Sequence, residues 1–329
     1  MAAESGEFHP SASWEVLHLR ARLLRRIRRF FEDREFLEVE TPLLSADTVI
    51  DRHLDPIPVT LFADPRQMAA GSRRWLQTSP EFAMKRLLAA GAPSIYQITR
   101  AFRGGEVGRL HNPEFTIVEW YGVEDGMQQG MQLLSELAEV LFQHGPAERI
   151  SYAAAFERWL GIDPHGADGP KLAVVAERQG IAVPDSLPME DRDGWLDLLL
   201  VECIEPHLGF ESPVILYDYP ATQAALARLR GDRTPVAERF ELYFRGIELA
   251  NGYHELMDPD ELRCRNQQIN RLRHTDGKPL LPESSRLLAA MEHGLPPCTG
   301  VALGFDRSVM LVCGAKELSE VIAFPSEIA

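Results

Sequence analysis

The sequence predicts an α+β fold in which helices pack around a mixed sheet. Two observations support this prediction. Segments 94–102 and 114–121 have strand character, and a polar, glycine-containing loop joins them where a βαβ unit would place a helix. Segments with apolar residues at helical spacing, such as 14–34 and much of 126–210, provide the helices. A sheet of alternating parallel βαβ units is therefore not expected.

The first expected helix spans about 14–34, with apolar residues at helical spacing and many arginines on its outer face. A solvated helix face is the more common meaning of such a charge run, and a docking surface for an acidic partner is the alternative. A strand at 36–41 follows and ends at Pro42. The arginines are Arg20, Arg22, Arg25, Arg26, Arg28 and Arg29.

The remaining elements alternate between helical and strand patterns. A short helix follows Thr78-Ser79-Pro80-Glu81, because the hydroxyl residues can cap it, proline suits its first turn and Glu81 favours its positive end. After the mainly helical segment 126–210, we expect a short strand at 214–217 and a β-rich segment at 238–249 that ends in a turn at Asn251-Gly252. Helices at 259–273 and 284–293, a glycine-bearing strand, another helix and a last short strand complete the chain.

Composition limits the class of protein. The chain is 45% apolar and 25% charged, which is an ordinary globular balance. Its formal net charge of −15 repels nucleic acid on average, although a local basic patch could still bind it. No stretch approaches 18 uncharged apolar residues, and the N-terminus lacks a secretory pattern, so we expect a soluble, cytoplasmic protein with no membrane association.

Several common catalytic motifs are missing from the sequence. It has no G-x-x-x-x-G-K-[ST] loop and no G-x-G-x-x-G after a strand, which argues against P-loop and Rossmann nucleotide sites. It also lacks a G-x-S-x-G elbow and an H-E-x-x-H pair. Arginines and carboxylates are instead concentrated in three segments.

The first segment is 100–121, RAFRGGEVGRLHNPEFTIVEWY. Arg103 lies where a strand ends and a glycine-containing loop begins, a position from which its guanidinium can bind a phosphate. Arg109 and His111 add further donors, and Phe115 offers a flat face on which a base could stack. Any one of these arginines taken alone is more often a surface ion pair.

The second segment is 240–256, FELYFRGIELANGYHEL, in which Glu241, Glu248 and Glu255 recur at steps of seven. They either form a charged surface or converge to hold Mg²⁺ and a substrate cation. The third segment is 300–307, GVALGFDR, whose small residues let the backbone approach a ligand beside Arg307. A buried Asp306–Arg307 pair is the competing explanation.

In this order, the three segments resemble the signature motifs of class II aminoacyl-tRNA synthetases, most closely the lysyl subgroup. Segment 29–42 is similar to motif 1, FRGGEVGRLHNPEF to motif 2 and GVALGFDR to motif 3, and TSPE and ELANGYHEL add detail. The resemblance implies a mainly antiparallel sheet flanked by helices. It also implies one catalytic domain over 1–329 with a mainly helical insertion at about 126–235, and a homodimer formed through motif 1.

The resemblance also implies roles for individual residues. Arg103 and Arg307 would be the catalytic residues, and Glu241 and Glu248 would hold Mg²⁺. The residues implied to bind ATP are Arg103, Glu106, His111, Asn112, Phe115, Glu241, Glu248, Gly304 and Arg307, with the adenine between Phe115 and Arg307. Those implied to bind the amino acid are Glu81, Glu119, Tyr121, Asn251, Glu255 and Ala302. Several carboxylates suit a dicationic amino acid, because a buried ammonium without partners is costly.

Three departures from a tRNA synthetase are visible. Motif 1 begins almost at the N-terminus, so we expect no anticodon-binding OB domain. Ala302 stands where motif 3 of the synthetases has glycine, and Gly105 replaces the glutamate two places after the motif 2 arginine. The short N-terminus and Ala302 resemble the ligases that attach (R)-β-lysine to a lysine of elongation factor P. That resemblance implies ATP-dependent activation of β-lysine or lysine and transfer to this protein, with tRNA disfavoured.

Two alternatives remain open at this point. The chain could be a truncated synthetase-like enzyme that charges tRNA or releases a free aminoacyl-adenylate. It could also be a catalytically inactive paralogue that binds lysine or a protein, which only Gly105 favours.

Overall fold

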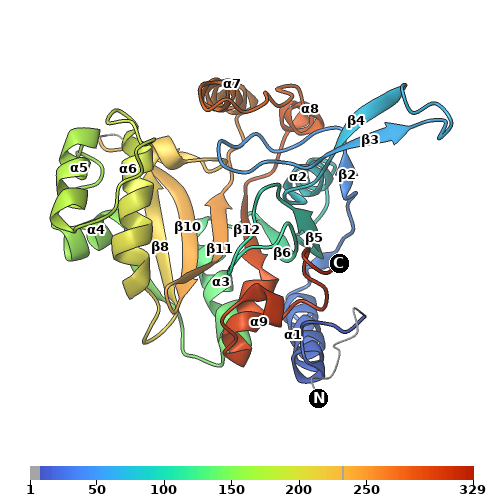
Figure 1. Ribbon diagram of the computed structural model, residues 1–329, viewed down its shortest axis with the longest axis horizontal. Coiled ribbons are helices and arrows are strands. Elements are labelled where there is room, and N and C mark those ends of the chain that lie inside the picture. Colours follow the sequence, from blue (N-terminus) through green and yellow to red (C-terminus); the bar gives the residue numbers. More distant parts are fainter. Residues whose placement is uncertain (1–7, 232) are drawn as a thin grey trace, which may run out of the picture. The chain divides into compact units, whose positions relative to one another are not determined.

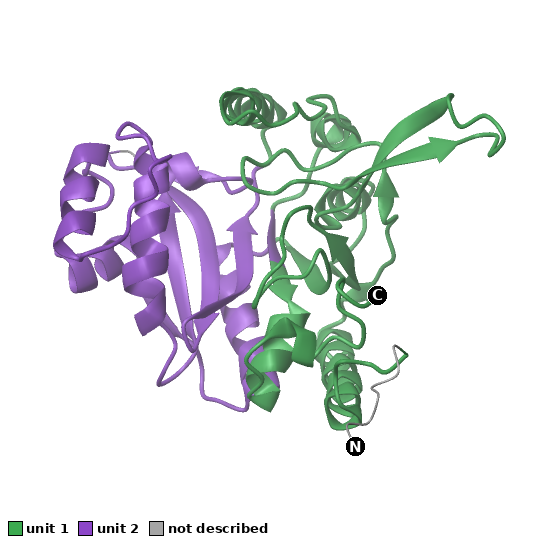
Figure 2. Cartoon of the chain, in the orientation of Figure 1, with its two compact units in different colours: residues 1–124, 257–297, 302–329 green, residues 125–256, 298–301 purple. Residues whose placement is uncertain are grey.

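The computed structural model describes residues 8–231 and 233–329. The chain divides into two compact units, which Figure 2 shows in different colours. Unit 1 comprises residues 1–124, 257–297 and 302–329, and unit 2 comprises 125–256 and 298–301. Each unit is described by itself below.

Helix α1 (Trp14–Glu32) opens unit 1. The hydroxyl of Ser13 accepts a hydrogen bond from the N–H of Val16 at 3.3 Å, which caps the helix start. The helix buries a stripe of apolar residues against the unit: Leu23, Ile27, Phe30 and Phe31. Five of the six arginines expected on the outer face are exposed. Arg20 is the exception, because its side chain turns inward and is only 13% exposed.

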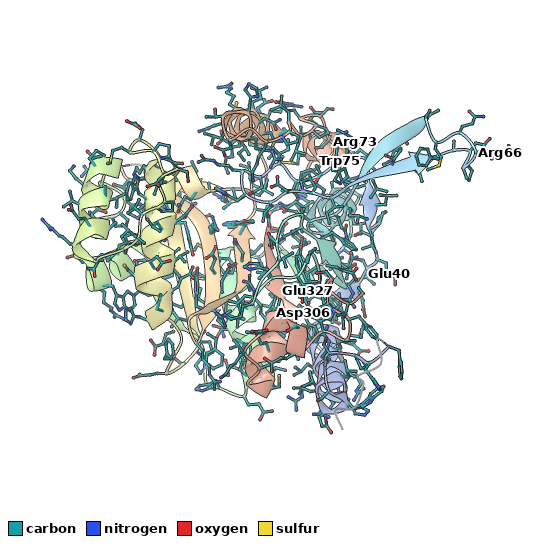
Figure 3. The ribbon with its side chains drawn as sticks, viewed as in Figure 1. Glu40, Arg66, Arg73, Trp75, Asp306 and Glu327 are labelled. Atoms are coloured by element: carbon teal, nitrogen blue, oxygen red, sulfur yellow. The ribbon has the colours of Figure 1, made fainter. Side chains whose placement is uncertain are left out.

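The strands of unit 1 form two groups. Strand β5 (Ile95–Phe102) pairs antiparallel with β6 (Glu114–Val123) and parallel with the two-residue β1 (Leu37–Glu38), so the strand expected at 36–41 is much shorter. A second sheet has the order β2 (Leu44–Ser45), β4 (Gly71–Leu76), β3 (Pro58–Phe62). Its hairpin projects from unit 1 in Figure 1, and Arg66 lies at the tip in Figure 3.

The other helices of unit 1 are α2 (Glu81–Ala89), α7 (Pro259–Thr275), α8 (Arg286–His293) and α9 (Phe305–Cys313). The expected helices after TSPE, at 259–273 and at 284–293 are thus confirmed. The last short strand is wrong, because a single 3₁₀ turn, Leu318–Glu320, occupies that part of the chain.

Unit 2 contains four α-helices and most of a sheet in its described part. The helices are α3 (Met127–Phe142), α4 (Tyr152–Leu160), α5 (Gly169–Arg178) and α6 (Arg192–Leu199), and α6 continues into the π-helix Leu200–Ile204 and the 3₁₀ turn Glu205–His207. A further 3₁₀ turn spans Ala221–Gln223. The strands run β11 (Ile247–His254), β10 (Val236–Phe244), β8 (Val214–Pro220), β7 (Glu148–Ser151), with β9 (Leu229–Arg230) also on β10.

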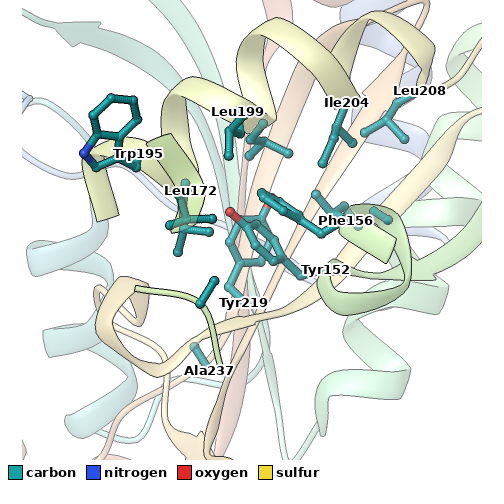
Figure 4. Packing of buried hydrophobic residues seen from close by; sticks show 14 of the residues in the cluster. Tyr152, Phe156, Leu172, Trp195, Leu199, Ile204, Leu208, Tyr219 and Ala237 are labelled. Carbon is teal, nitrogen blue, oxygen red and sulfur yellow. The ribbon is translucent and has the colours of Figure 1, made fainter. Parts of the chain in front are cut away.

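A hydrophobic core joins these helices to the sheet of unit 2. Tyr152 and Phe156 of α4 stack with ring centroids 4.6 Å apart, and Tyr152 also meets Tyr219 of β8 at 4.9 Å (Figure 4). Whether the segment 126–235 is an insertion in a single domain stays a prediction. It contains the four helices, but β7, β8 and β9 also lie within it.

Strands β10 and β11 form a hairpin whose turn is Arg245-Gly246, with φ of 53° and 71°. The turn expected at Asn251-Gly252 is wrong, because those residues lie inside β11, where glycine gives room for the ring of Phe240. The pairing register shifts once: Leu242 faces Ala250 and Tyr243 faces Glu248, which leaves Leu249 as an extra residue in β11.

Strand β12 (Cys298–Gly304) contributes its first four residues to unit 2 and its last three to unit 1. Most strand pairs within the two units are antiparallel, and helices flank them. The predicted α+β class is therefore confirmed. Among the residues that the structure describes, no helix is long and apolar enough to cross a membrane.

Candidate active site

Arg103 directly follows β5 and is fixed at its backbone, where its N–H donates to the carbonyl of Pro113 at 2.9 Å. Its guanidinium carbon lies 4.9 Å from the centre of the Phe115 ring, and its Nη1 is 3.8 Å from a Glu106 oxygen. The Nε atom is buried and has no hydrogen-bond partner among the described residues. A buried donor without an acceptor suits an anionic ligand, as the phosphate-binding prediction requires.

Arg307 lies in the first turn of α9, close to the motif 2 loop. Its Nε donates to the carbonyl of Leu110 at 3.2 Å, and its Nη2 is 2.8 Å from Nε2 of His111. Partial burial and the neighbouring Arg307 charge lower the pKa of His111, so the imidazole is neutral at pH 7 and accepts from the guanidinium. In this pair the positive charge is therefore on Arg307, whose helix begins directly after Gly304.

Asp306, labelled in Figure 3, has a partner different from the one expected. Its Oδ1 lies 2.7 Å from Nη1 of Arg20, and its Oδ2 accepts from the N–H of Thr116 at 2.7 Å. The competing explanation of a buried Asp306–Arg307 pair is thus wrong. Asp306 instead ties α9 to α1 and β6, which leaves the Arg307 guanidinium on the side of His111.

Asn112 has both side-chain polar atoms engaged with the backbone. Its Nδ2 donates to the carbonyl of Glu114 at 2.5 Å, and its Oδ1 accepts from the N–H of Ser326 at 3.0 Å. The side chain therefore ties the end of the motif 2 loop to the C-terminal segment. Its implied contact with ATP stays a prediction.

Gly105 departs from the synthetase pattern for a local reason. Its φ is +79°, a conformation that a glutamate would adopt only with strain. Glu106, the next residue, supplies a carboxylate near Arg103 instead. The backbone turn thus explains why glycine stands in place of glutamate. Gly105 was the only feature that favoured an inactive paralogue, and it now supports that alternative less.

A buried cluster on α2 and β6 contains the residues expected to meet an amino group. Oε1 of Glu81 accepts from Nζ of Lys85 at 2.5 Å. Glu119 accepts at 2.6 Å from the hydroxyl of Ser79 and at 2.7 Å from that of Tyr121. Burial first, and then the Glu81 charge, raise the pKa of Glu119 to about 7. Two carboxylates and one ammonium thus share a small volume away from water.

Ala302 lies on β12, two residues before Gly304, and is partly exposed. Both belong to unit 1. The part of Ala302 in amino-acid binding stays a prediction.

The second group of predicted site residues belongs to unit 2. Glu241 is 4% exposed, and both of its oxygens are occupied. Oε1 accepts from Arg239 at 2.5 Å and from Asn251 at 3.1 Å, while Oε2 accepts from the hydroxyls of Tyr219 and Tyr243, each at 2.5 Å. Burial raises the pKa of both tyrosines well above the usual value, so they remain donors at neutral pH.

This arrangement bears on the expected Mg²⁺ site. Four donors use the acceptor capacity of Glu241, so a direct metal bond would have to displace one of them. Glu248 is partly exposed and lies opposite Tyr243 on the neighbouring strand. Mg²⁺ on a nucleotide needs only one or two protein carboxylates, because phosphates and water complete its coordination. Glu248 therefore fits the metal better than Glu241, and both assignments stay predictions.

The bulge in β11 determines which side chains share a face with Glu248. Without an extra residue, Glu248 and Asn251 would point to opposite faces, because side chains alternate along a strand. The extra residue Leu249 brings both to the same face. Glu255, which is 1% exposed, directly follows the end of β11. It lies four residues after Asn251, and an even spacing places two side chains on the same face of an extended strand.

Sequence reasoning missed four residues that shape these clusters. Lys85 was detectable, because a lysine four places after Glu81 on a helix lies on the same face. Arg239 and Tyr243 were also detectable, because residues two places from Glu241 on one strand share its face. Tyr219 gave no such signal, since its contact with Glu241 depends on the pairing of β8 with β10.

Comparison with known proteins decides the family. Residues 8–328 match the family described as tRNA synthetases class II (D, K and N). The chain belongs to this family. Among curated members of it, the chain is 48% identical over 324 residues to "Elongation factor P--(R)-beta-lysine ligase" of Yersinia enterocolitica, covering 98% of each chain. Proteins of the same name from Klebsiella pneumoniae and Proteus mirabilis are 48% and 47% identical, again over 98% of each chain. The family match agrees with the α+β fold described above.

Proposed function

We propose that this chain is an ATP-dependent ligase that activates (R)-β-lysine, or lysine, as an aminoacyl-adenylate and transfers it to a lysine of elongation factor P. The observation that carries the proposal is the 48% identity over 98% of both chains to a protein named as this ligase. Because the sequence identity extends over almost the whole of both chains, no large unmatched segment is left that could form a different active site.

In the first step, a carboxylate oxygen of the amino acid attacks the α-phosphorus of ATP, and the bond to pyrophosphate breaks. Arg103 is the residue best suited to the α-phosphate, because its Nε is buried and unpartnered. Arg307, with neutral His111 as its neighbour, would meet the outer phosphates. Catalysis of this kind depends on positioning and charge neutralisation, so no side chain need act as nucleophile.

The amino acid carries two ammonium groups, and the two carboxylate clusters offer acceptors for them. Glu81, Glu119 and Tyr121 would meet the amine close to the reacting carboxylate. Asn251 and Glu255 would meet the distal amine, and Oδ1 of Asn251 is buried without a partner in the described chain. Mg²⁺, held by Glu248 together with the phosphates, would neutralise charge on the departing pyrophosphate.

In the second step, the ε-amine of the acceptor lysine attacks the carbonyl carbon of the adenylate. The carbon–oxygen bond to AMP breaks, AMP leaves with the electron pair, and the attacking amine loses a proton. An amide bond results.

We also propose that the ligase is a homodimer, as motif 1 implies. Light scattering on the purified protein checks this proposal: a mass near twice 36.9 kDa is expected, and a mass near 36.9 kDa at micromolar concentration would contradict it.

Intact-mass spectrometry of elongation factor P tests the activity. The protein is incubated with the enzyme, Mg-ATP and either lysine isomer, and parallel samples omit ATP or offer lysine tRNA as the acceptor. A mass gain of one lysyl unit, faster with the β isomer, is expected. Transfer to tRNA without any gain on the protein would replace this proposal with the synthetase alternative.

A matched pair of variants tests the role of Arg103. Arg103→Ala should lower ATP–pyrophosphate exchange by about 100-fold or more, the usual cost of one transition-state donor. Arg100→Ala is the control, because Arg100 lies three residues earlier in a half-exposed pair with Glu114 at 3.5 Å. The control should stay within about twofold of wild type. Exchange retained by folded Arg103→Ala protein would refute the assignment.

A further inference from the structure

Lys85 is one of the most deeply buried charged side chains of unit 1, with 2% of its surface exposed. Its ammonium is 2.5 Å from Glu81 and 5.9 Å from the centre of the Tyr121 ring. Both neighbours belong to the cluster proposed above to hold the amine near the reacting carboxylate. No family resemblance or curated name assigns a function to this lysine.

The charges of this cluster can be counted. Glu81 and Glu119 bring two negative charges when both are ionised, and Lys85 brings one positive charge. The other close groups, the hydroxyls of Ser79 and Tyr121, are neutral donors to Glu119. On the neighbouring strand, Gln97 lies opposite Glu119 and is also neutral. One negative charge is therefore left, which matches one substrate ammonium.

Without Lys85, two buried carboxylates would face each other. Like charges at this distance in a dry site cannot both stay ionised at neutral pH, so one carboxylate would take up a proton. A protonated Glu119 could not accept an ammonium as an ion pair. The cluster would then lose the acceptor that the substrate needs.

We propose that Lys85 is a positioning residue of the amine site: its ion pair with Glu81 favours the ionised form of Glu119, whose charge then neutralises the substrate's ammonium. This inference rests on the proposed function, because it assumes that the cluster binds an amino group. It deepens that function by naming the group that sets how many ammonium ions the site accepts.

A helical ion pair between residues four apart can also be purely structural. Exposed pairs of this kind contribute little to stability. The pair of Glu81 and Lys85 is almost fully buried, and a buried pair is poor evidence for stability, because desolvation offsets its attraction. A lysine that served only packing could be replaced by an uncharged chain of similar length without any effect on amine binding.

The experiment is the pH dependence of the amino-acid KM in ATP–pyrophosphate exchange, for wild type and Lys85→Met. Wild type should show a KM that falls as the pH rises through the ionisation of Glu119. In Lys85→Met this fall should move to higher pH by about one unit, which makes KM at pH 7 up to about tenfold larger while KM at pH 9 is nearly restored. The KM for ATP should not move. Lys85→Arg should restore the wild-type profile.

A second variant keeps the test valid if Lys85→Met folds poorly. Glu81→Gln removes the neighbouring negative charge but keeps an acceptor for Lys85, so the fall in KM should move to lower pH. Arg86→Met is the matched control, because Arg86 directly follows Lys85 on α2 and its side chain is exposed. Its profile should equal that of wild type.

The outcomes separate the two proposals. Suppose that wild type catalyses ATP–pyrophosphate exchange, but the pH profiles of KM for Lys85→Met and Glu81→Gln do not move in opposite directions. The role of Lys85 is then refuted and the ligase activity stands. If Lys85→Met loses only thermal stability, Lys85 is structural and the inference is likewise refuted. If wild type shows no exchange that depends on amino acid, both the proposed function and this inference fall.

Discussion

Replacing Asp306 with alanine should destabilise unit 1 by about 3 to 5 kcal/mol, the cost of breaking a buried ion pair. Asp306 is 2% exposed and meets both the Arg20 guanidinium and the N–H of Thr116 at 2.7 Å. Its loss leaves a cation 13% exposed and a backbone donor without an acceptor. We expect the lower half of that range, because Arg20 also donates to the carbonyl of Val321 at 3.0 Å and contacts the Phe305 ring at 5.0 Å.

Urea unfolding at pH 7, followed by circular dichroism and tryptophan fluorescence, measures the effect. With a slope of up to about 3 kcal/mol per molar urea, a loss of 3 kcal/mol lowers the midpoint by about 1 M or more. Lys171→Ala is the control, because Lys171 pairs with Asp168 at 3.6 Å and is 65% exposed. It should change stability by less than about 0.5 kcal/mol. A midpoint for Asp306→Ala equal to that of the control would refute the assigned structural role.

Three further outcomes are expected. Ala302→Gly should relax selectivity toward α-lysine by about tenfold, a typical value for one carbon, and an unchanged ratio of kcat/KM for the isomers would count against it. Glu248→Gln should raise the Mg²⁺ concentration needed for half-maximal exchange. Glu241→Gln should mainly lower the free energy of unfolding, by about 1–3 kcal/mol, because its four donors lose an ionised acceptor. Equal Mg²⁺ titrations for the two variants would contradict this prediction. The raised pKa of Glu119 means that the folded state keeps this proton above the ordinary value of 4.5. Its contribution to the free energy of unfolding should therefore be lost as the pH rises from about 4.5 to about 7, and Glu119→Gln should flatten that slope.

Much of the fold was predictable because the signals are local. Apolar spacing with capping residues predicted α1, α2, α7 and α8 to within a few residues, and the strands around the motif 2 loop were placed within one or two residues at each end. The failures concern tertiary context. The strand at 36–41 is short because regular pairing with β5 covers only Leu37 and Glu38 and ends with a hydrogen bond from the N–H of Val39 to the carbonyl of Tyr96. The hairpin turn was misplaced because Asn251-Gly252 is the stronger turn sequence, yet its glycine fits against Phe240 within a strand.

The candidate site shows the same division. Motif resemblance selected Arg103, Arg307 and Glu119. In the structure, Arg103 has a buried donor, Arg307 has a neutral histidine as its neighbour, and the pKa of Glu119 is raised. The sequence could not reveal that Asp306 pairs with Arg20, nearly three hundred residues away. It also could not reveal that four donors enclose Glu241, because two of them, Asn251 and Tyr219, come from the neighbouring strands β11 and β8 and depend on strand register.

Because β11 contains one extra residue, the faces of its side chains depend on the bulge as well as on their spacing in the sequence. Deleting Leu249 would remove the bulge and leave Glu248 two positions from Asn251, so regular alternation would keep both side chains on the same face. A relative with one residue fewer between Glu248 and Asn251 could thus keep both side chains on one face in a regular strand, without a bulge. In this strand, the number of residues between two side chains predicts their faces only when the bulge is taken into account.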